Sequence, residues 1–123
     1  MDIVPIKGSF AREVQDHALW DRTTDLKQKE ICKAYRQHGV LVFRRQAMSE
    51  QELLEFGKLV GEPSLYAEPN WLSTVPEVII LSNMRSQKGK ILGGLANKAL
   101  TWHTDQSYYA KPVTGCFLYG VEL

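Results

Sequence analysis

The order in which hydrophobic patterns follow one another constrains the fold of this chain more than any other feature of its sequence. Before Gly61, apolar residues recur at the spacing of amphipathic helices, and after it they form short runs separated by turn residues. Helices that come first, with strands afterwards, are typical of α+β domains and not of alternating βαβ units. We therefore predict an α+β, mostly β, fold with two N-terminal helices.

The first helix is predicted over residues 25–38. Thr24 or Asp25 can cap its start, and Gly39 stands where a helix C-cap glycine is common. The next run, residues 40–43, is apolar and β-branched, which favours a buried strand. The apolar residues that keep roughly to one face of the helix are Leu26, Ile31, Ala34 and Tyr35.

The second helix follows a capping box, in which the Ser49 hydroxyl and the Glu52 carboxylate satisfy unpaired backbone N–H groups. Met48 can pack onto Leu53 as a hydrophobic staple, and Gly61 ends the helix. Both helices are interpreted as packing elements. The face predicted to be buried comprises Leu53, Phe56 and Val60.

Two apolar runs beyond Gly61 predict strands, a core strand at residues 78–81 and another strand at residues 114–121. The polar connection at residues 82–98 is basic and contains no acidic residue. It is interpreted either as a lid that attracts an anionic substrate or, with more support from its composition, as a solvated loop.

Composition excludes several classes of protein. The 123 residues fit one domain, and 44% hydrophobic with 24% charged residues is ordinary globular composition. A formal net charge of +1 gives no reason to expect nucleic-acid or membrane binding.

The first residues lack the pattern of a signal peptide, so a cytoplasmic location is expected. Cys32 and Cys116 are therefore predicted to be buried thiols and not a disulfide.

One short segment, residues 101–108, carries residues suited to chemistry. In an extended segment, residues two apart point to the same side, so His103 and Asp105 can present a nitrogen and an oxygen to one metal ion. These are two of the three ligands of a 2-His-1-carboxylate site for Fe(II). From their spacing alone, a strand-end histidine hydrogen-bonded to a nearby aspartate is the favoured interpretation.

No other histidine completes this site in the sequence. His17 lies in a charged segment, and His38 ends the first helix, where a cation suits the helix dipole. A zinc or cupin-like site that adds Cys116 to His103 and Asp105 is a weaker alternative, because the cysteine is not at a ligand-like spacing.

The sequence around these residues resembles the TauD/TfdA family of Fe(II)- and 2-oxoglutarate-dependent dioxygenases. The core of the resemblance is Trp-His-Thr-Asp-Gln-Ser-Tyr at residues 102–108. In matching order, residues 3–14 resemble the opening hairpin of the family, residues 38–44 its first core strand, and residues 49–63 its helix and following turn. The resemblance covers the whole chain.

The resemblance implies a double-stranded β-helix, a jelly-roll-like barrel with the metal at one mouth. It implies that His103 and Asp105 bind Fe(II) and that 2-oxoglutarate is the cosubstrate for oxidation of a small organic substrate. Gln106 and Tyr66 match positions that face the substrate in members of the family. Trp102 and Tyr108 are expected to pack in the core of the barrel. The alternative is that they form walls of the iron pocket.

Family members continue past the point that corresponds to Leu123. Their later sequence holds a Gly-Gly-Asp-Thr-like stretch, the distal His ligand and the Arg that binds 2-oxoglutarate. We therefore expect residues 1–123 to be the N-terminal portion of an incomplete barrel, with no detectable 2-oxoglutarate turnover on its own. A complementing C-terminal half or a homo-oligomer would cover its strand edges. The alternative function is an inactive remnant or interaction module of the same fold.

Overall fold

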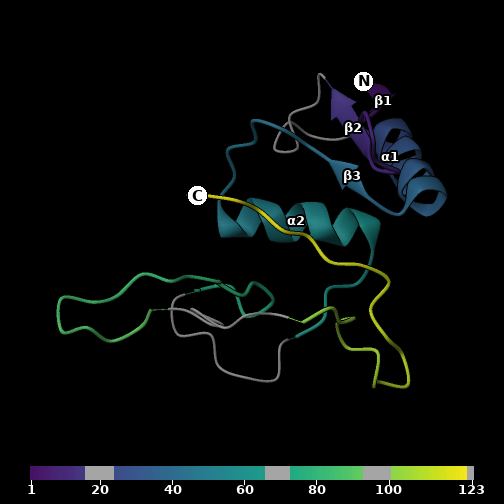
Figure 1. Ribbon diagram of the computed structural model, residues 1–123. Coiled ribbons are helices and arrows are strands. Elements are labelled where there is room, and N and C mark those ends of the chain that lie inside the picture. The colour runs from purple at the N-terminus through teal and green to yellow at the C-terminus, as the bar shows by residue number, and fades with distance from the viewer. Residues whose placement is uncertain (16–23, 66–72, 93–100, 122–123) are drawn as a thin grey trace. The chain divides into compact units, whose positions relative to one another are not determined.

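The computed structural model of the chain describes residues 1–15, 24–65, 73–92 and 101–121 (Figure 1). The chain divides into two compact units, an N-terminal unit of Met1–Glu62 and a C-terminal unit of Pro63–Leu123. All of the helices and named strands of the described residues belong to the N-terminal unit. In order they are β1 (Asp2–Pro5), β2 (Arg12–Gln15), α1 (Asp25–His38), β3 (Leu41–Val42) and α2 (Glu50–Val60).

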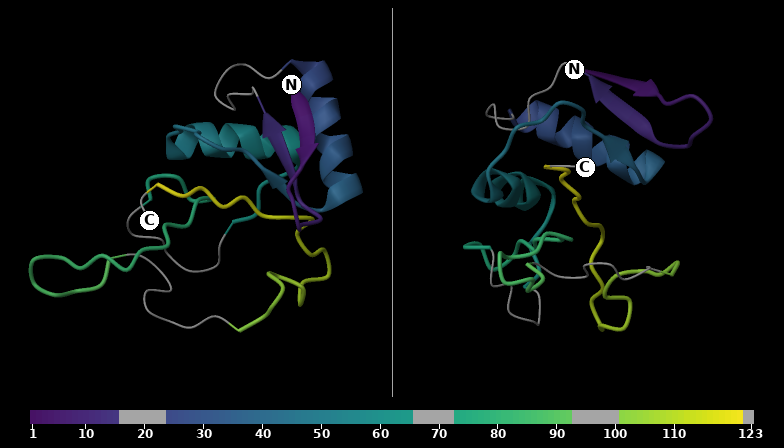
Figure 2. Two further views of the ribbon diagram at one scale, coloured as in Figure 1. Left: turned by 45° about the horizontal axis from the view of Figure 1, so that its top comes forward. Right: turned by 60° about the vertical axis from the view of Figure 1, so that its left-hand side comes forward.

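The three strands form one mixed sheet in the order β1-β2-β3. β1 and β2 pair antiparallel, with Ile3 opposite Val14, whereas β2 and β3 pair parallel, with Arg12 opposite Leu41. Figures 1 and 2 show α1 beside these strands, and it contacts both β3 and α2. The chain thus runs from β2 through α1 to a parallel β3. This is a single βαβ crossover, and the described residues show no alternation of such units, in agreement with the predicted α+β class.

Helix α1 begins and ends where the sequence predicts. The Thr24 side-chain oxygen accepts a hydrogen bond from the backbone N–H of Lys27 at 3.4 Å. Gly39 adopts the left-handed conformation with φ 75°, and its N–H donates to the Tyr35 carbonyl at 2.7 Å. A residue with a Cβ is strained in that conformation, so glycine is the residue that closes this helix most easily.

The apolar face of α1 is narrower than predicted. Ile31 and Ala34 are buried, but Leu26 is 74% exposed. Ile31 is five positions after Leu26, so the two side chains point about 140° apart around the helix axis at 3.6 residues per turn. Including Leu26 in the buried face was therefore wrong.

Helix α2 has the predicted capping box. The backbone N–H of Ser49 donates to Glu52 Oε2 at 2.7 Å, and the N–H of Glu52 donates to Ser49 Oγ at 3.3 Å. These hydrogen bonds lower the pKa of Glu52, the backbone contact contributing most. The helix ends before Gly61, whose N–H donates to the Gly57 carbonyl at 3.1 Å.

The core of the N-terminal unit forms around Ile31 of α1 and Phe56 of α2. The Phe43 ring packs edge-on against Phe56, with 5.8 Å between ring centroids. In α2 the buried residues are Leu54 and Phe56, while the predicted Leu53 is only half-buried. Other apolar residues packed against this core are Met1, Leu41, Met48, Leu59 and Val60.

The strands predicted at residues 78–81 and 114–121 are not formed. The first run contributes one bridge residue, Leu81, and is not a core strand, since Ile79 and Leu81 are 38% and 49% exposed. Apolar residues favour an extended backbone, but a strand also needs a hydrogen-bonded neighbour. Among the described residues of the C-terminal unit, no such neighbour pairs with either run.

The connection after Leu81 contains a short hairpin in its described part. Arg85 and Ile91 form an antiparallel bridge, and the N–H of Leu92 donates to the Met84 carbonyl at 2.9 Å. Gly89, with φ 77°, turns the chain at the tip. The basic side chains in the described part of this connection, Arg85, Lys88 and Lys90, are exposed, which agrees with the solvated-loop interpretation.

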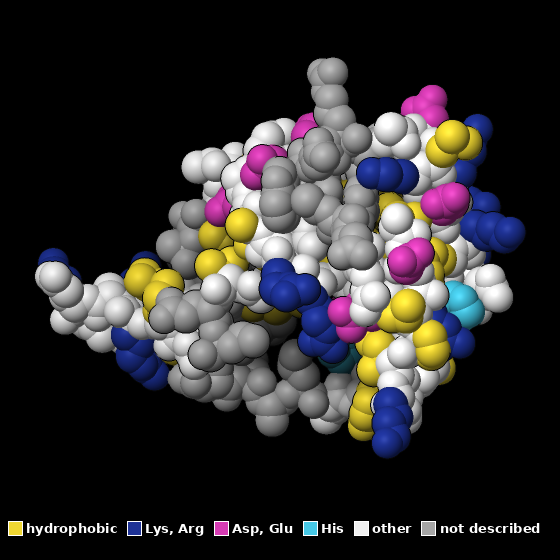
Figure 3. All heavy atoms as spheres, turned by 90° about the horizontal axis from the view of Figure 1, so that it is seen from above, with side chains coloured by type: hydrophobic (Ala, Val, Ile, Leu, Met, Phe, Trp, Pro, Cys, Tyr) yellow, Lys and Arg dark blue, Asp and Glu magenta, His cyan; other side chains and the backbone are white. Residues whose placement is uncertain are grey.

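The described residues form an α+β architecture, as predicted, but their regular structure is mainly helical and not mostly β. Cys32 and Cys116 are both free thiols, but Cys32 is half-buried and Cys116 exposed, so the prediction of buried thiols was wrong. Neither helix of the described residues is long and apolar enough to cross a bilayer. Acidic and basic side chains are interspersed on the face drawn in Figure 3, as the small net charge leads one to expect.

Candidate metal centre

His103 and Asp105 face each other in the C-terminal unit. The chain runs without regular structure through residues 101–104 and then enters a turn at residues 105–108. His103 Nε2 lies 3.3 Å from Asp105 Oδ1. The pairing of these two side chains, which the sequence predicts from their spacing, is present.

The other ring nitrogen of His103 is held by the backbone. Nδ1 lies 2.7 Å from the Thr101 carbonyl oxygen. A carbonyl oxygen can only accept, so Nδ1 carries the hydrogen, and in the neutral ring Nε2 keeps its lone pair. A second hydrogen bond of this kind commonly orients the histidine ligands of metal sites.

This donor set fits a divalent cation. The Nε2 lone pair and a carboxylate oxygen of Asp105 repel each other at 3.3 Å unless a proton or a cation lies between them. Imidazole nitrogen with carboxylate oxygen is the combination found in non-haem Fe(II) sites. The two side chains are 50% and 59% exposed, so a metal ion and further ligands can reach them from solvent.

The described residues supply two ligands and not three. Within the described ranges, no group of three His, Cys, Asp or Glu side chains is close enough to hold a metal ion. The alternative zinc site, which adds Cys116 to His103 and Asp105, is therefore not formed. His38 is the last residue of α1, as predicted, and His17 lies outside the described residues.

The aromatic residues beside the pair are not packed as expected. Trp102 is fully exposed and Tyr108 is 80% exposed, so the prediction that both are core aromatics was wrong. Tyr108 contacts the ring of Tyr109, with 4.7 Å between centroids. The two rings are tilted by 41° and belong to neighbouring residues of the chain.

Gln106, one of the two predicted substrate-facing residues, is half-buried beside Asp105. Its backbone has φ 51°, and its Oε1 accepts a hydrogen bond from Ser64 Oγ at 3.2 Å. Sequence reasoning missed Ser64, because no local pattern marks a contact that joins residues 42 positions apart. Tyr66, the other predicted residue, lies outside the described residues.

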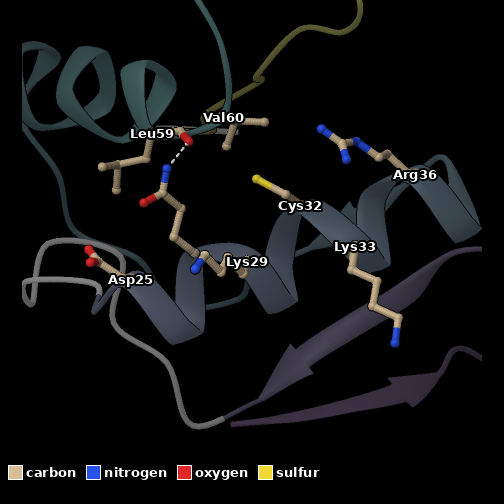
Figure 4. Close-up of a pocket in the computed structure, with 8 residues that line it drawn as sticks. Asp25, Lys29, Cys32, Lys33, Arg36, Leu59 and Val60 are labelled. Atoms are coloured by element: carbon tan, nitrogen blue, oxygen red, sulfur yellow. Dashed lines mark hydrogen bonds between the residues drawn. The ribbon is translucent and has the colours of Figure 1, made fainter.

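A separate groove lies within the N-terminal unit, between α1 and the end of α2 (Figure 4). Gln28 Nε2 donates to the Leu59 carbonyl across it and so joins the two helices. Figure 4 shows Lys33 extending away from α2, while Cys32 points toward Val60. The described residues that line this groove include no group of three metal-ligating side chains.

Comparison with known proteins identifies a family and a curated relative. The family described as "Taurine catabolism dioxygenase TauD, TfdA family" matches residues 2–123. The pentalenolactone F synthase of Streptomyces avermitilis is 33% identical over 126 residues, which cover 100% of this chain and 41% of that protein. The chain thus spans less than half the length of this curated relative. No solved structure matches.

Proposed function

The chain belongs to the TauD/TfdA family of dioxygenases, and we propose that it acts as part of an Fe(II)- and 2-oxoglutarate-dependent dioxygenase. The observation that carries this proposal is the facing pair of His103 Nε2 and Asp105 Oδ1, 3.3 Å apart, within a chain matched by the family along its length. A jelly-roll barrel is the proposed fold, and the described sheet and helices would form part of it.

His103 and Asp105 would hold Fe(II), with the Thr101 carbonyl keeping the histidine in the tautomer that can bind a metal. When bound, the metal supplies the oxidation in which O₂, 2-oxoglutarate and a substrate C–H bond yield a hydroxylated substrate, succinate and CO₂. The exposed positions of both side chains leave room for the cosubstrate and for ligands that lie outside the described residues.

Gln106 is proposed to contact the substrate. Its Oε1 already accepts a hydrogen bond from Ser64, so its NH₂ group remains as the donor for an oxygen atom of the substrate. Tyr66 is proposed as a second substrate contact on the family resemblance alone.

The substrate is proposed to be a small organic molecule. The relative is named for the synthesis of pentalenolactone F, so lactone-related compounds are the first class to test. A complementing C-terminal half, or a second copy of the chain, is the proposed protein partner. The cytoplasmic location expected from the sequence stays a prediction.

The first experiment measures metal binding by the chain without requiring turnover. Mn(II), a stable substitute for Fe(II), is titrated while its electron paramagnetic resonance signal is followed. We expect His103→Ala and Asp105→Ala each to weaken binding at least about tenfold, since each removes one donor. His38→Ala is the matched control and should bind as the unmodified chain does. Equal binding by all four proteins would exclude the proposed site.

The second experiment measures succinate formation from 2-oxoglutarate, dependent on Fe(II) and O₂, by the protein as its gene encodes it. Succinate that disappears in the His103→Ala variant supports the dioxygenase. Metal binding with no succinate in any form of the protein supports the alternative, an inactive member of the family.

A further inference from the structure

A hydrogen bond from Ser64 to Gln106 joins two distant segments of the C-terminal unit. It joins residues 42 positions apart, with 3.2 Å between Ser64 Oγ and Gln106 Oε1. Ser64 follows the helical half of the chain by only a few residues, whereas Gln106 directly follows Asp105. The contact therefore connects the candidate metal centre to a distant part of the sequence.

Gln106 occupies a backbone conformation that needs support. Its φ of 51° lies in the left-handed region, which non-glycine residues seldom adopt. Such conformations persist only where surrounding contacts hold them. Among the residues that the structure describes, Ser64 binds the Gln106 side chain, and the Gln106 carbonyl accepts from the N–H of Tyr109 at 3.1 Å.

The conformation of Gln106 bears directly on Asp105. The two residues share a peptide plane, and the turn at residues 105–108 begins at Asp105. A different φ at Gln106 would redirect the chain next to the carboxylate that faces His103. Residues that orient a ligand from outside the coordination sphere commonly affect metal affinity strongly.

We propose that Ser64 is a positioning residue for the candidate metal centre. Its hydroxyl holds the Gln106 amide and so maintains the left-handed turn that presents Asp105 toward His103. The proposal rests on the proposed function, because it assigns Ser64 to the same site. Ser64 does not itself bind the metal in this account.

Mn(II) titration of the chain tests this role. We expect Ser64→Ala to weaken Mn(II) binding about tenfold, the lower end of what loss of such an orienting contact costs. Ser64→Thr keeps a hydroxyl and should retain the affinity. Ser107→Ala makes the same chemical change at an exposed serine next to Gln106 and should have no effect. Wild-type affinity in Ser64→Ala would overturn the proposal.

A second variant separates positioning from general loosening of the fold. Glycine adopts the left-handed backbone without strain, so adding Gln106→Gly to Ser64→Ala should restore Mn(II) binding. Thermal unfolding of the single and double variants should stay close to that of the unmodified chain. A loss of affinity that persists in the double variant contradicts action through the backbone turn.

The outcome also distinguishes this inference from the proposed function. If the unmodified chain binds no Mn(II), the proposed function fails. The effect of Ser64 on the positions of Gln106 and Asp105 is then tested by nuclear magnetic resonance. In that measurement Ser64→Ala should shift the Gln106 side-chain amide signals and the backbone signals of Asp105. Unchanged signals would overturn the positioning role.

Discussion

At the scale of single residues, Ser49 and Glu52 show which interactions the sequence reveals. Each capping contact of α2 lies within three residues of its partner, so the pattern of residue types is enough to predict the geometry. The contact from Ser64 to Gln106 obeys the same hydrogen-bond chemistry. It could not be predicted, because its partners meet only after the chain between them has folded.

The capping box makes stability depend on pH. The pKa of Glu52 is lowered in the folded state by its hydrogen bonds from Ser49. Its stabilisation is therefore fully present above the ordinary value of 4.5 and is lost as the pH falls through the lowered folded-state pKa. We expect Glu52→Gln to reduce the fall in melting temperature on acidification, as followed by circular dichroism. Glu62→Gln, an exposed glutamate outside the helix, is the control and should leave the acid profile unchanged.

At the scale of elements, the two predicted helices are formed, whereas the two strands predicted in the C-terminal unit are not. The bounds of α1 follow from Thr24 and Gly39, because helix hydrogen bonds are local. The runs at residues 78–81 and 114–121 have strand-like composition, but pairing depends on a partner that composition does not specify. For the same reason, the pair of His103 and Asp105 was predictable from spacing, while the exposure of Trp102 was not.

The packing of α1 against α2 leads to a prediction for two apolar residues of different burial. Phe56 is buried against Ile31 and Phe43, so Phe56→Ala should lower the free energy of unfolding by about 3–5 kcal/mol. Leu26 lies on the exposed side of α1, so Leu26→Ala should change the free energy of unfolding by less than about 0.5 kcal/mol. Urea denaturation of both variants measures the difference. Equal losses would mean that Phe56 is not part of a packed core.

At the scale of the whole molecule, the two units differ in how they treat apolar side chains. The N-terminal unit buries a core around Ile31 and Phe56, whereas in the described part of the C-terminal unit Val75 is the buried hydrophobic residue. Trp102, Leu118 and Val121 are each more than four-fifths exposed. Exposed apolar side chains in such number mark surfaces that associate with other chains or segments.

We therefore expect the 123-residue chain to self-associate, with an associated fraction that rises as the protein concentration is raised. Leu118→Glu places a charge on the exposed apolar segment and should shift sedimentation toward the monomer. Leu26→Glu makes the same change at an exposed leucine of the N-terminal unit and should not. If both variants sediment as the unmodified chain does, the apolar side chains of the C-terminal unit are not what drives association.

The parallel pairing of β2 with β3 has a consequence for how fast the N-terminal unit folds. β1 and β2 are close in sequence and can meet early, but β3 can join only after the chain that contains α1 has closed a long loop. A preformed α1 shortens that search. The caps of α1, Thr24 and Gly39, should therefore govern the folding rate of this unit more than its unfolding rate.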